Sequence, residues 1–331
     1  MPLFSLQDLE AAHATVRQFV PETPTYAWPL LKKRTGVDIF VKHENHTPTG
    51  SFKARGGVTY VDALMKSGEK PTGLVTATRG NHGQSVALGA TRNGIPSYIV
   101  VPEGNSQEKI AAMRAFGANV IISGKDFDES RKVAQKLQEE HGYHMVPPFH
   151  ENLVKGVSTY ALELYRAVAD LDVVYVPIGM GSGICSLITV RDLLGLKTKI
   201  IGVTAENAAA FALSFTAGKP VQTETANTFA DGMACRDPQP EPLEIILKGA
   251  EDVVTVSEDQ IAEALAVYYT DTHNLAEGAG AAPLAALMAN RHNLQGKRVA
   301  TILTGGNIGL ATFMSVMNSH RAASEITSAP A

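Results

Sequence analysis

The chain has 331 residues, 44% of them hydrophobic and 19% charged, and a formal net charge of −4 at pH 7. This length and composition predict a folded protein with two lobes and exclude a largely disordered chain. The small net charge gives no electrostatic reason to expect nucleic acid or a membrane surface as a partner. Two cysteines are too few for a disulfide framework, and no signal peptide or membrane span is recognisable. We therefore expect a cytoplasmic globular protein.

The first half of the chain alternates between helical and strand patterns. A helix is predicted over residues 5–19, where Ser5 and Asp8 have the spacing of a capping box. A strand over 38–44 and a helix over 53–67 come next. Three apolar, β-branched runs follow, each with a helical pattern after it. The runs are residues 73–78, 96–102 and 119–124, and the helices are 80–93, 106–116 and 126–141. This alternation is typical of a parallel sheet covered by helices on both faces.

The second half repeats the alternation. Strands are predicted at 172–178, 199–206, 252–257 and 298–306, with helices at 184–194 and beginning at Glu258 and Gly280. Residues 143–152 contain two prolines and are interpreted as a return between lobes, and residues 219–241 as a long loop near the site.

We therefore expect an α/β protein with two lobes, each a mostly parallel sheet covered by helices. The small domain is predicted at 47–150, and the large domain at 1–46 plus 151–331. The last ten residues are expected to form a frayed tail.

Small and polar residues follow three of the predicted strands. They form the segments 79–84, 179–183 and 304–307. In open α/β sheets, ligands bind outside the carboxyl ends of the strands, where a following helix offers free N–H groups to an anion. These three segments are therefore the candidate ligand-binding segments.

The glycine-rich segment from Gly179 to Gly183 has two interpretations. Its glycines and the Ser182 hydroxyl suit a phosphate group. A nicotinamide dinucleotide is the alternative, because Glu206 ends the next strand where a ribose-binding acid would fall. The spacing is Gly-x-Gly-x-Gly rather than Gly-x-Gly-x-x-Gly, and the dinucleotide alternative gives the other candidate segments no role.

The stretch Asn-His-Thr-Pro-Thr-Gly-Ser-Phe-Lys-Ala-Arg-Gly-Gly places Lys53 between a turn and a helix. A lysine here can be a solvated side chain in a surface turn. Together with three downstream segments, however, it forms an ordered set: "SFKARGG", "GNHGQ", the glycine loop before a helix, and "LTGGN". This set resembles the fold-type II pyridoxal-phosphate enzymes over roughly residues 15 to 320. "GNHGQ" resembles the serine/threonine dehydratase and serine racemase branch.

The resemblance implies roles at the cofactor, pyridoxal 5′-phosphate. Lys53 corresponds to the lysine that forms the Schiff base and, when released as a free amine, removes the α-proton of the substrate. Asn81 corresponds to the residue that binds the pyridine 3-oxygen, and Thr304 to the hydroxyl that faces the pyridine nitrogen. The phosphate cup corresponds to Gly179, Met180, Gly181, Ser182 and Gly183, with Met180 in place of the usual glycine. Phe52 packs beside the cofactor or anchors the core, and Glu277 corresponds to an acid near the cofactor in relatives.

The resemblance also implies a substrate loop that binds the α-carboxylate. Its residues are Ser51, Thr78, Arg79, Gly80, Asn81 and His82. Arg79 departs from the small residue or serine found in relatives, and it cannot act as a second acid or base because it stays protonated. It either binds an extra carboxylate on the substrate, as in 3-hydroxyaspartate, or points to solvent or an interface.

The expected activity is β-elimination of water from a β-hydroxy amino acid, giving an oxo acid and ammonia. The alternatives are an amino-acid racemase of the serine racemase type and, from another class, a dinucleotide-dependent oxidoreductase. We expect a homodimer or homotetramer without a regulatory domain. No metal site is expected, because Asn227 stands where relatives carry Glu, and this leaves Asp231 as the candidate ligand for a divalent cation.

Overall fold

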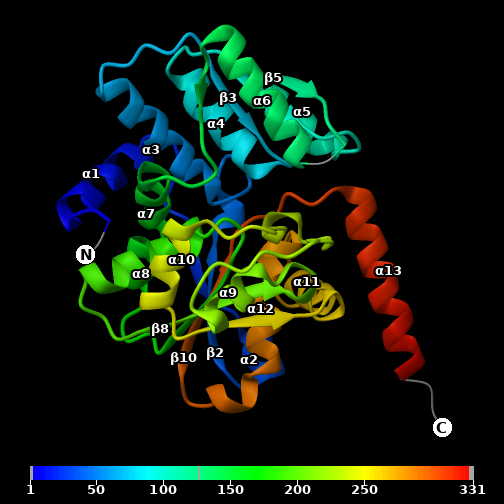
Figure 1. Ribbon diagram of the computed structural model, residues 1–331. Coiled ribbons are helices and arrows are strands. Elements are labelled where there is room, and N and C mark those ends of the chain that lie inside the picture. The colour runs from blue at the N-terminus through cyan, green and yellow to red at the C-terminus, as the bar shows by residue number, and fades with distance from the viewer. Residues whose placement is uncertain (1–2, 126, 328–331) are drawn as a thin grey trace. The chain divides into compact units, whose positions relative to one another are not determined.

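The computed structural model of the protein describes residues 3–125 and 127–327, which divide into two compact units (Figure 1). The first unit contains the residues up to Glu22 and His46–Glu163, and the second contains Thr23–Asn45 and the residues from Leu164 onward. The first unit is thus larger than the lobe expected at 47–150, because helix α1 (Leu6–Arg17) packs on helix α3 (Lys53–Lys66). The division into a small domain and a cofactor-binding domain stays a prediction.

The first unit is built on a four-stranded sheet in which every pairing is parallel. Its strand order is β5 (Ala118–Ile122), β4 (Ser97–Val101), β3 (Leu74–Ala77) and β6 (His144–Met145). The helices of this unit, besides α1 and α3, are α4 (Asn81–Arg92), α5 (Gln107–Ala115), α6 (Phe127–His141) and most of α7 (Glu151–Ala167).

Helices α4 and α6 cover opposite faces of this sheet. Leu74 and Ile99 lie in one apolar cluster with Val86 of α4, whereas Val75 and Val100 lie in another with Ala134 of α6. Successive side chains of a strand point to opposite faces, so the two clusters are the two sides of the sheet. This is the doubly covered arrangement expected from the continuous apolar runs.

The second unit is built on a six-stranded sheet that is parallel except at one edge. Its order is β1 (Thr25–Ala27, antiparallel), β2 (Asp38–His43), β10 (Arg298–Leu303), β7 (Val173–Pro177), β8 (Lys199–Ala205) and β9 (Asp252–Val256). The helices are α2 (Pro29–Thr35), α8 (Ser182–Leu193), α9 (Ala210–Ala217), α10 (Pro240–Gly249), α11 (Glu258–Thr272), α12 (Gly278–Ala289) and α13 (Leu310–Thr327). Short 3-10 turns lie at Glu44–His46, Glu206–Ala208, Asp231–Met233 and Arg291–Leu294.

The expected fold class is confirmed by both sheets. The capping box also forms, with the Asp8 N–H donating to Ser5 Oγ at 3.1 Å and the Ser5 N–H donating to Asp8 Oδ2 at 3.0 Å. Several elements were not predicted: β1, α2, β6, α7, α9, α10 and α13. Helix α13 continues to Thr327 through most of the segment expected to fray, and residues 328–331 lie outside the described residues.

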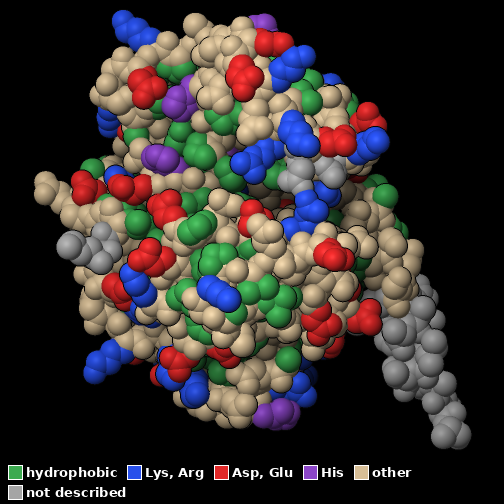
Figure 2. Space-filling model, in the orientation of Figure 1, with side chains coloured by type: hydrophobic (Ala, Val, Ile, Leu, Met, Phe, Trp, Pro, Cys, Tyr) green, Lys and Arg blue, Asp and Glu red, His purple; other side chains and the backbone are tan. Residues whose placement is uncertain are grey.

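Charged side chains of both signs lie on the displayed face of each unit (Figure 2). This distribution agrees with the small formal net charge of −4. Within residues 3–125 and 127–327, no helix has the length and apolar character required to cross a bilayer.

Candidate active site

Lys53 is the first residue of α3, directly after a tight turn in the first unit. The Ser51 N–H donates to Thr47 Oγ1 at 2.9 Å, and the Thr47 hydroxyl donates to the Ser51 carbonyl at 2.7 Å. Gly50 has a φ of +68°, which favours glycine. The turn buries Ser51, whose Oγ has no hydrogen-bond partner in the described part of the chain. Lys53 Nζ lies 5.2 Å from the centroid of the Phe52 ring.

Helices α3 and α4 touch along their backbones. A Cβ atom on Gly57 of α3 would collide with the backbone carbonyl of Ser85 in α4, and one on Gly89 of α4 would lie 2.8 Å from the Gly57 carbonyl oxygen. Lys53 and Asn81, which begin these two helices, are therefore carried on one tightly packed helix pair.

The expected substrate loop follows strand β3 and leads into α4. Thr78 Oγ1 accepts a hydrogen bond from the Gly80 N–H at 3.0 Å. Thr78 and Gly80 are buried and Asn81 is half-buried, whereas Arg79 is exposed. The structure places these residues together at the carboxyl end of a parallel strand, as expected.

His82 is buried in the first turn of α4 and is held neutral. Burial, and secondly the charge of Lys53, lower the pKa of His82 to about 3, although a hydrogen bond to the Val146 backbone opposes the shift. Nε2 of His82 has no hydrogen-bond partner among the described residues, so Nδ1 is the nitrogen that faces the Val146 carbonyl. The ring therefore keeps a buried lone pair on Nε2.

In the second unit, the glycine loop joins β7 to α8. Gly181 has a φ of +94°, and a Cβ atom there would lie 2.7 Å from Cβ of Pro242. A Cβ atom on Gly179 would collide with the Gly232 carbonyl oxygen. Ser182 begins α8 and is buried together with Gly183, while Met180 is half-buried. The first N–H groups of a helix have no partner inside the helix, which suits this loop to an anion.

The carboxyl end of β10 contributes a buried hydroxyl to the second unit. Thr304 is 2% exposed, and its Oγ1 has no hydrogen-bond partner among the described residues. The adjacent Gly305 carbonyl accepts from the Glu277 N–H at 3.0 Å, at the start of α12. Glu277 is itself buried. These contacts fix Thr304 and Glu277 on neighbouring segments.

The remaining candidates form no further catalytic centre. No group of three or more His, Cys, Asp or Glu side chains in the described ranges is arranged to hold a metal ion, and Asp231 lies in a 3-10 turn. Burial raises the pKa of Cys235 to about 11 and raises that of Cys185 further, so neither thiol is a ready nucleophile. Glu206 is exposed at the end of β8.

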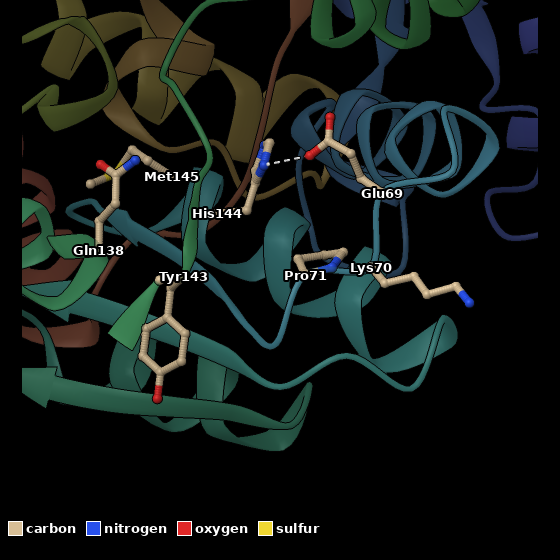
Figure 3. Close-up of a pocket in the computed structure, with 8 residues that line it drawn as sticks. Glu69, Lys70, Pro71, Gln138, Tyr143, His144 and Met145 are labelled. Carbon is tan, nitrogen blue, oxygen red and sulfur yellow. Dashed lines mark ion pairs between the residues drawn. The ribbon is translucent and has the colours of Figure 1, made fainter. Parts of the chain in front are cut away.

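A pocket of about 360 Å³ lies elsewhere in the first unit and contains none of the candidate residues (Figure 3). In it, Nδ1 of His144 lies 3.3 Å from Glu69, and Nε2 of His144 lies 2.8 Å from the Tyr60 hydroxyl. Burial, followed by the charge of Glu69, raises the pKa of Tyr60 to about 12.

Comparison with known proteins assigns the family. The family model described as pyridoxal-phosphate dependent enzyme matches residues 16–305. The L-threonine ammonia-lyase of Thermotoga maritima is 35% identical over 317 residues, which cover 96% of this chain and 79% of that protein. The chain belongs to the pyridoxal-phosphate-dependent enzyme family. The alternative of a dinucleotide-dependent oxidoreductase is thereby excluded.

Solved structures of this family have the same fold. The processed threonine deaminase isoform 2 of Solanum lycopersicum is 31% identical, with a TM-score of 0.87 and coverage of 94% of this chain and 92% of that chain. Maize serine racemase is 26% identical, with a TM-score of 0.87 and coverage of 97% and 99%. Both expected branches, dehydratase and racemase, are therefore among the structural neighbours.

The residues present fit pyridoxal phosphate. The glycine loop offers N–H groups and a serine hydroxyl at a helix start, as a phosphate requires. Thr304 offers a buried hydroxyl that has no hydrogen-bond partner in the described ranges of the chain. Lys53 offers an amine at the end of a sharply defined turn.

Proposed function

We propose that the protein is a pyridoxal-phosphate-dependent ammonia-lyase that eliminates water from a β-hydroxy amino acid of the threonine or serine type. The observation that carries this proposal is Thr304, a buried neutral hydroxyl where the resemblance expects the partner of the pyridine nitrogen. A hydroxyl does not hold that nitrogen protonated as a carboxylate would. The weaker electron sink favours β-elimination over wider carbanion chemistry.

The cofactor would be held by the candidate residues described above. Gly179, Met180, Gly181, Ser182 and Gly183 would bind its phosphate through backbone N–H groups and the serine hydroxyl. Asn81 would bind the 3-oxygen, and Thr304 would face the ring nitrogen. Phe52 and Glu277 would lie beside the ring. When bound, the cofactor supplies an aldehyde for covalent attachment and an electron sink for the developing carbanion.

The protein residues would bind, orient and deprotonate the substrate. The Thr78 hydroxyl, Ser51 and the N–H groups from Arg79 to His82 would hold the α-carboxylate at the start of α4. Lys53, as a neutral amine, would take the α-proton. The bond from Cβ to the hydroxyl oxygen would then break, and the hydroxyl would leave as water by taking up a proton that replaces the one removed by Lys53. Hydrolysis of the released enamine or imine gives the oxo acid and ammonia.

A racemase of the serine racemase type is the second candidate, supported by the similarity to the maize enzyme. Racemisation needs an acid or base on each face of the α-carbon. Arg79 stands where the serine of the racemases would provide the second group, and a guanidinium stays protonated. Elimination is therefore the preferred activity.

A substrate panel tests the proposal. The purified protein should show the visible absorbance of bound pyridoxal phosphate, and it should release an oxo acid from L-threonine, L-serine or 3-hydroxyaspartate. Chiral chromatography of the remaining amino acid measures racemisation in the same samples. Inversion of configuration at the α-carbon without release of an oxo acid would show that the protein is a racemase and would contradict the proposed elimination.

A cytoplasmic location and a homodimeric or homotetrameric state are part of the proposal. Analytical ultracentrifugation of the loaded enzyme checks the oligomeric state. Sedimentation as a single chain at assay concentration would contradict it.

A further inference from the structure

Helix α7 contacts Phe52, Arg55 and Gly56, which lie on either side of Lys53 at the start of α3. The contacts come from one face of α7, at a spacing of three and four residues that places side chains in line along a helix. The contacting residues are Leu153, Gly156, Thr159, Tyr160 and Glu163, which we call the α7 seat.

Backbone and aromatic contacts form one part of this seat. The rings of Phe52 and Tyr160 meet edge to face with centroids 6.2 Å apart. A Cβ atom on Gly56 would lie 2.9 Å from the Leu153 carbonyl oxygen, and one on Gly156 would collide with the Arg55 carbonyl. The two helices thus have almost no free space between them next to Lys53.

A buried ion pair forms the other part. Arg55 donates from Nη1 to Glu163 Oε1 and from Nη2 to Glu163 Oε2, each at 2.8 Å, and Nη1 also donates to Thr159 Oγ1 at 3.0 Å. The side chains of Arg55 and Glu163 are 0% and 2% exposed. His13 of α1 approaches the same carboxylate at 3.4 Å. Such a fork of two parallel hydrogen bonds between a guanidinium and a carboxylate fixes the relative orientation of the two groups as well as their distance.

From this arrangement we infer that the Arg55–Glu163 ion pair positions Lys53 for proton abstraction, with Arg55 and Glu163 as positioning residues. Arg55 is two residues from Lys53 on the same helical turn, so the fork sets the rotation of that turn about the α3 axis. A rotation or slide of α3 would move the Lys53 amine away from the α-carbon. Such a misplacement costs about a hundredfold in rate per ångström. The inference rests on the proposed role of Lys53.

Substitutions that loosen the fork test this inference. Arg55→Lys keeps the positive charge but cannot form the two parallel hydrogen bonds to Glu163. Glu163→Gln keeps the shape of the side chain but removes its negative charge. We expect kcat to fall by about ten- to a hundredfold in each, with KM changed by less than about threefold, because chemistry rather than binding is impaired. Thr159→Val removes one acceptor of Arg55 and the hydrogen bond that the Thr159 hydroxyl donates to the Gly156 carbonyl at 2.8 Å, and it should lower kcat by severalfold. It serves as the gentler variant if the first two fail to fold.

The control is Asp271→Asn in the second unit. Asp271 accepts two hydrogen bonds from Arg34, at 2.6 and 2.7 Å, and its side chain is 6% exposed, whereas that of Arg34 is 44% exposed. This variant should lower the melting temperature but leave kcat unchanged. An equal loss of kcat in Asp271→Asn would mean that the Arg55 variants report general destabilisation, and it would overturn the inference.

A second measurement does not depend on turnover. After removal of the cofactor, an amine-reactive reagent is applied at low concentration, and peptide mapping gives the labelling rate of each lysine. The labelling rate of Lys53 should change in Arg55→Lys and Glu163→Gln, whereas the labelling rates of the other lysines should stay the same. Unchanged Lys53 labelling together with unchanged kcat in all three α3–α7 variants would overturn the inference. By contrast, wild-type protein that eliminates from no substrate would overturn the proposed function instead.

Discussion

The two units hold their candidate residues by different physical means. In the first unit, side-chain contacts at Lys53 add to the close backbone packing of α3: the Thr47 hydroxyl fixes the turn before it, and Arg55 and Phe52 anchor the helix that follows. In the second unit, close packing at glycines takes this part, because Cβ atoms on Gly179 and Gly181 would collide with the Gly232 carbonyl oxygen and with Pro242. Contacts made by side chains can be weakened in steps, whereas a glycine site tolerates almost no added atom. The two units should therefore respond differently to substitution.

The largest effect is expected for Lys53→Ala in the first unit. Removal of the amine takes away the covalent attachment and the base together, so kcat should fall by at least about a thousandfold. Borohydride reduction of the wild-type enzyme followed by peptide mapping should place the cofactor on Lys53. A label on another lysine would show that the assignment of the attachment site is wrong.

Gly181→Ala should be the most damaging change in the second unit. A positive φ costs a residue with a Cβ atom about 1–2 kcal/mol, and this Cβ would also press on Pro242. We expect cofactor affinity to fall by at least about tenfold. Fluorescence titration with pyridoxal phosphate measures it. Unchanged affinity would mean that the loop does not hold the phosphate.

Thr304→Ala tests the hydroxyl that carries the proposed function. The cofactor should remain bound, its absorbance spectrum should shift, and kcat should fall by about tenfold, in line with the loss of one hydrogen bond. Thr304→Ser is the control, because it keeps the hydroxyl. An unaltered spectrum in Thr304→Ala would show that Thr304 does not face the ring nitrogen.

His82 should make the first unit sensitive to acid. Its pKa falls from 6.5 to about 3 on folding, so between these pH values the unfolded chain binds a proton that the folded chain does not. The free energy of unfolding should therefore decrease as pH falls from 6.5 toward 3, by about 1.4 kcal/mol per pH unit from this group. His82→Asn should flatten that slope in urea titrations at several pH values. An identical slope in the variant would show that His82 is not the group responsible.

The smallest effect on threonine or serine is expected for Arg79→Ala. Arg79 is exposed, so its loss should change kcat/KM for these substrates by less than about twofold. If its guanidinium binds a second carboxylate, the loss on 3-hydroxyaspartate should reach about ten- to a hundredfold. Equal losses on all substrates would indicate that Arg79 shapes the loop instead.

The sequence predicted most elements whose pattern is strongly periodic or whose ends carry a signal. Ser5 and Asp8 located α1, and the apolar runs located β3, β4 and β5 because both faces of the sheet are covered. The short edge strand β1 and the two-residue strand β6 contain too few residues to show the alternation of apolar and polar residues that predicts a strand.

Helix α7 escaped prediction for a different reason. Two residues inside it, Gly156 and Thr159, have low helix propensity, and its polar residues Thr159 and Glu163 are buried. The candidate ligand-binding segments could be predicted from the order of the motifs along the chain. The α7 seat could not be anticipated, because it depends on contacts between residues about 100 positions apart.

The backbone contact between α3 and α4 limits how this enzyme can be redesigned. Gly57 and Gly89 leave no room for a larger side chain on either helix. Libraries of variants that substitute these two glycines will therefore mostly yield protein that does not fold. Positions such as Arg79, on the loop before α4, can change without moving either helix. Searches for new substrate preference should therefore begin there, with the helix pair kept as a fixed scaffold.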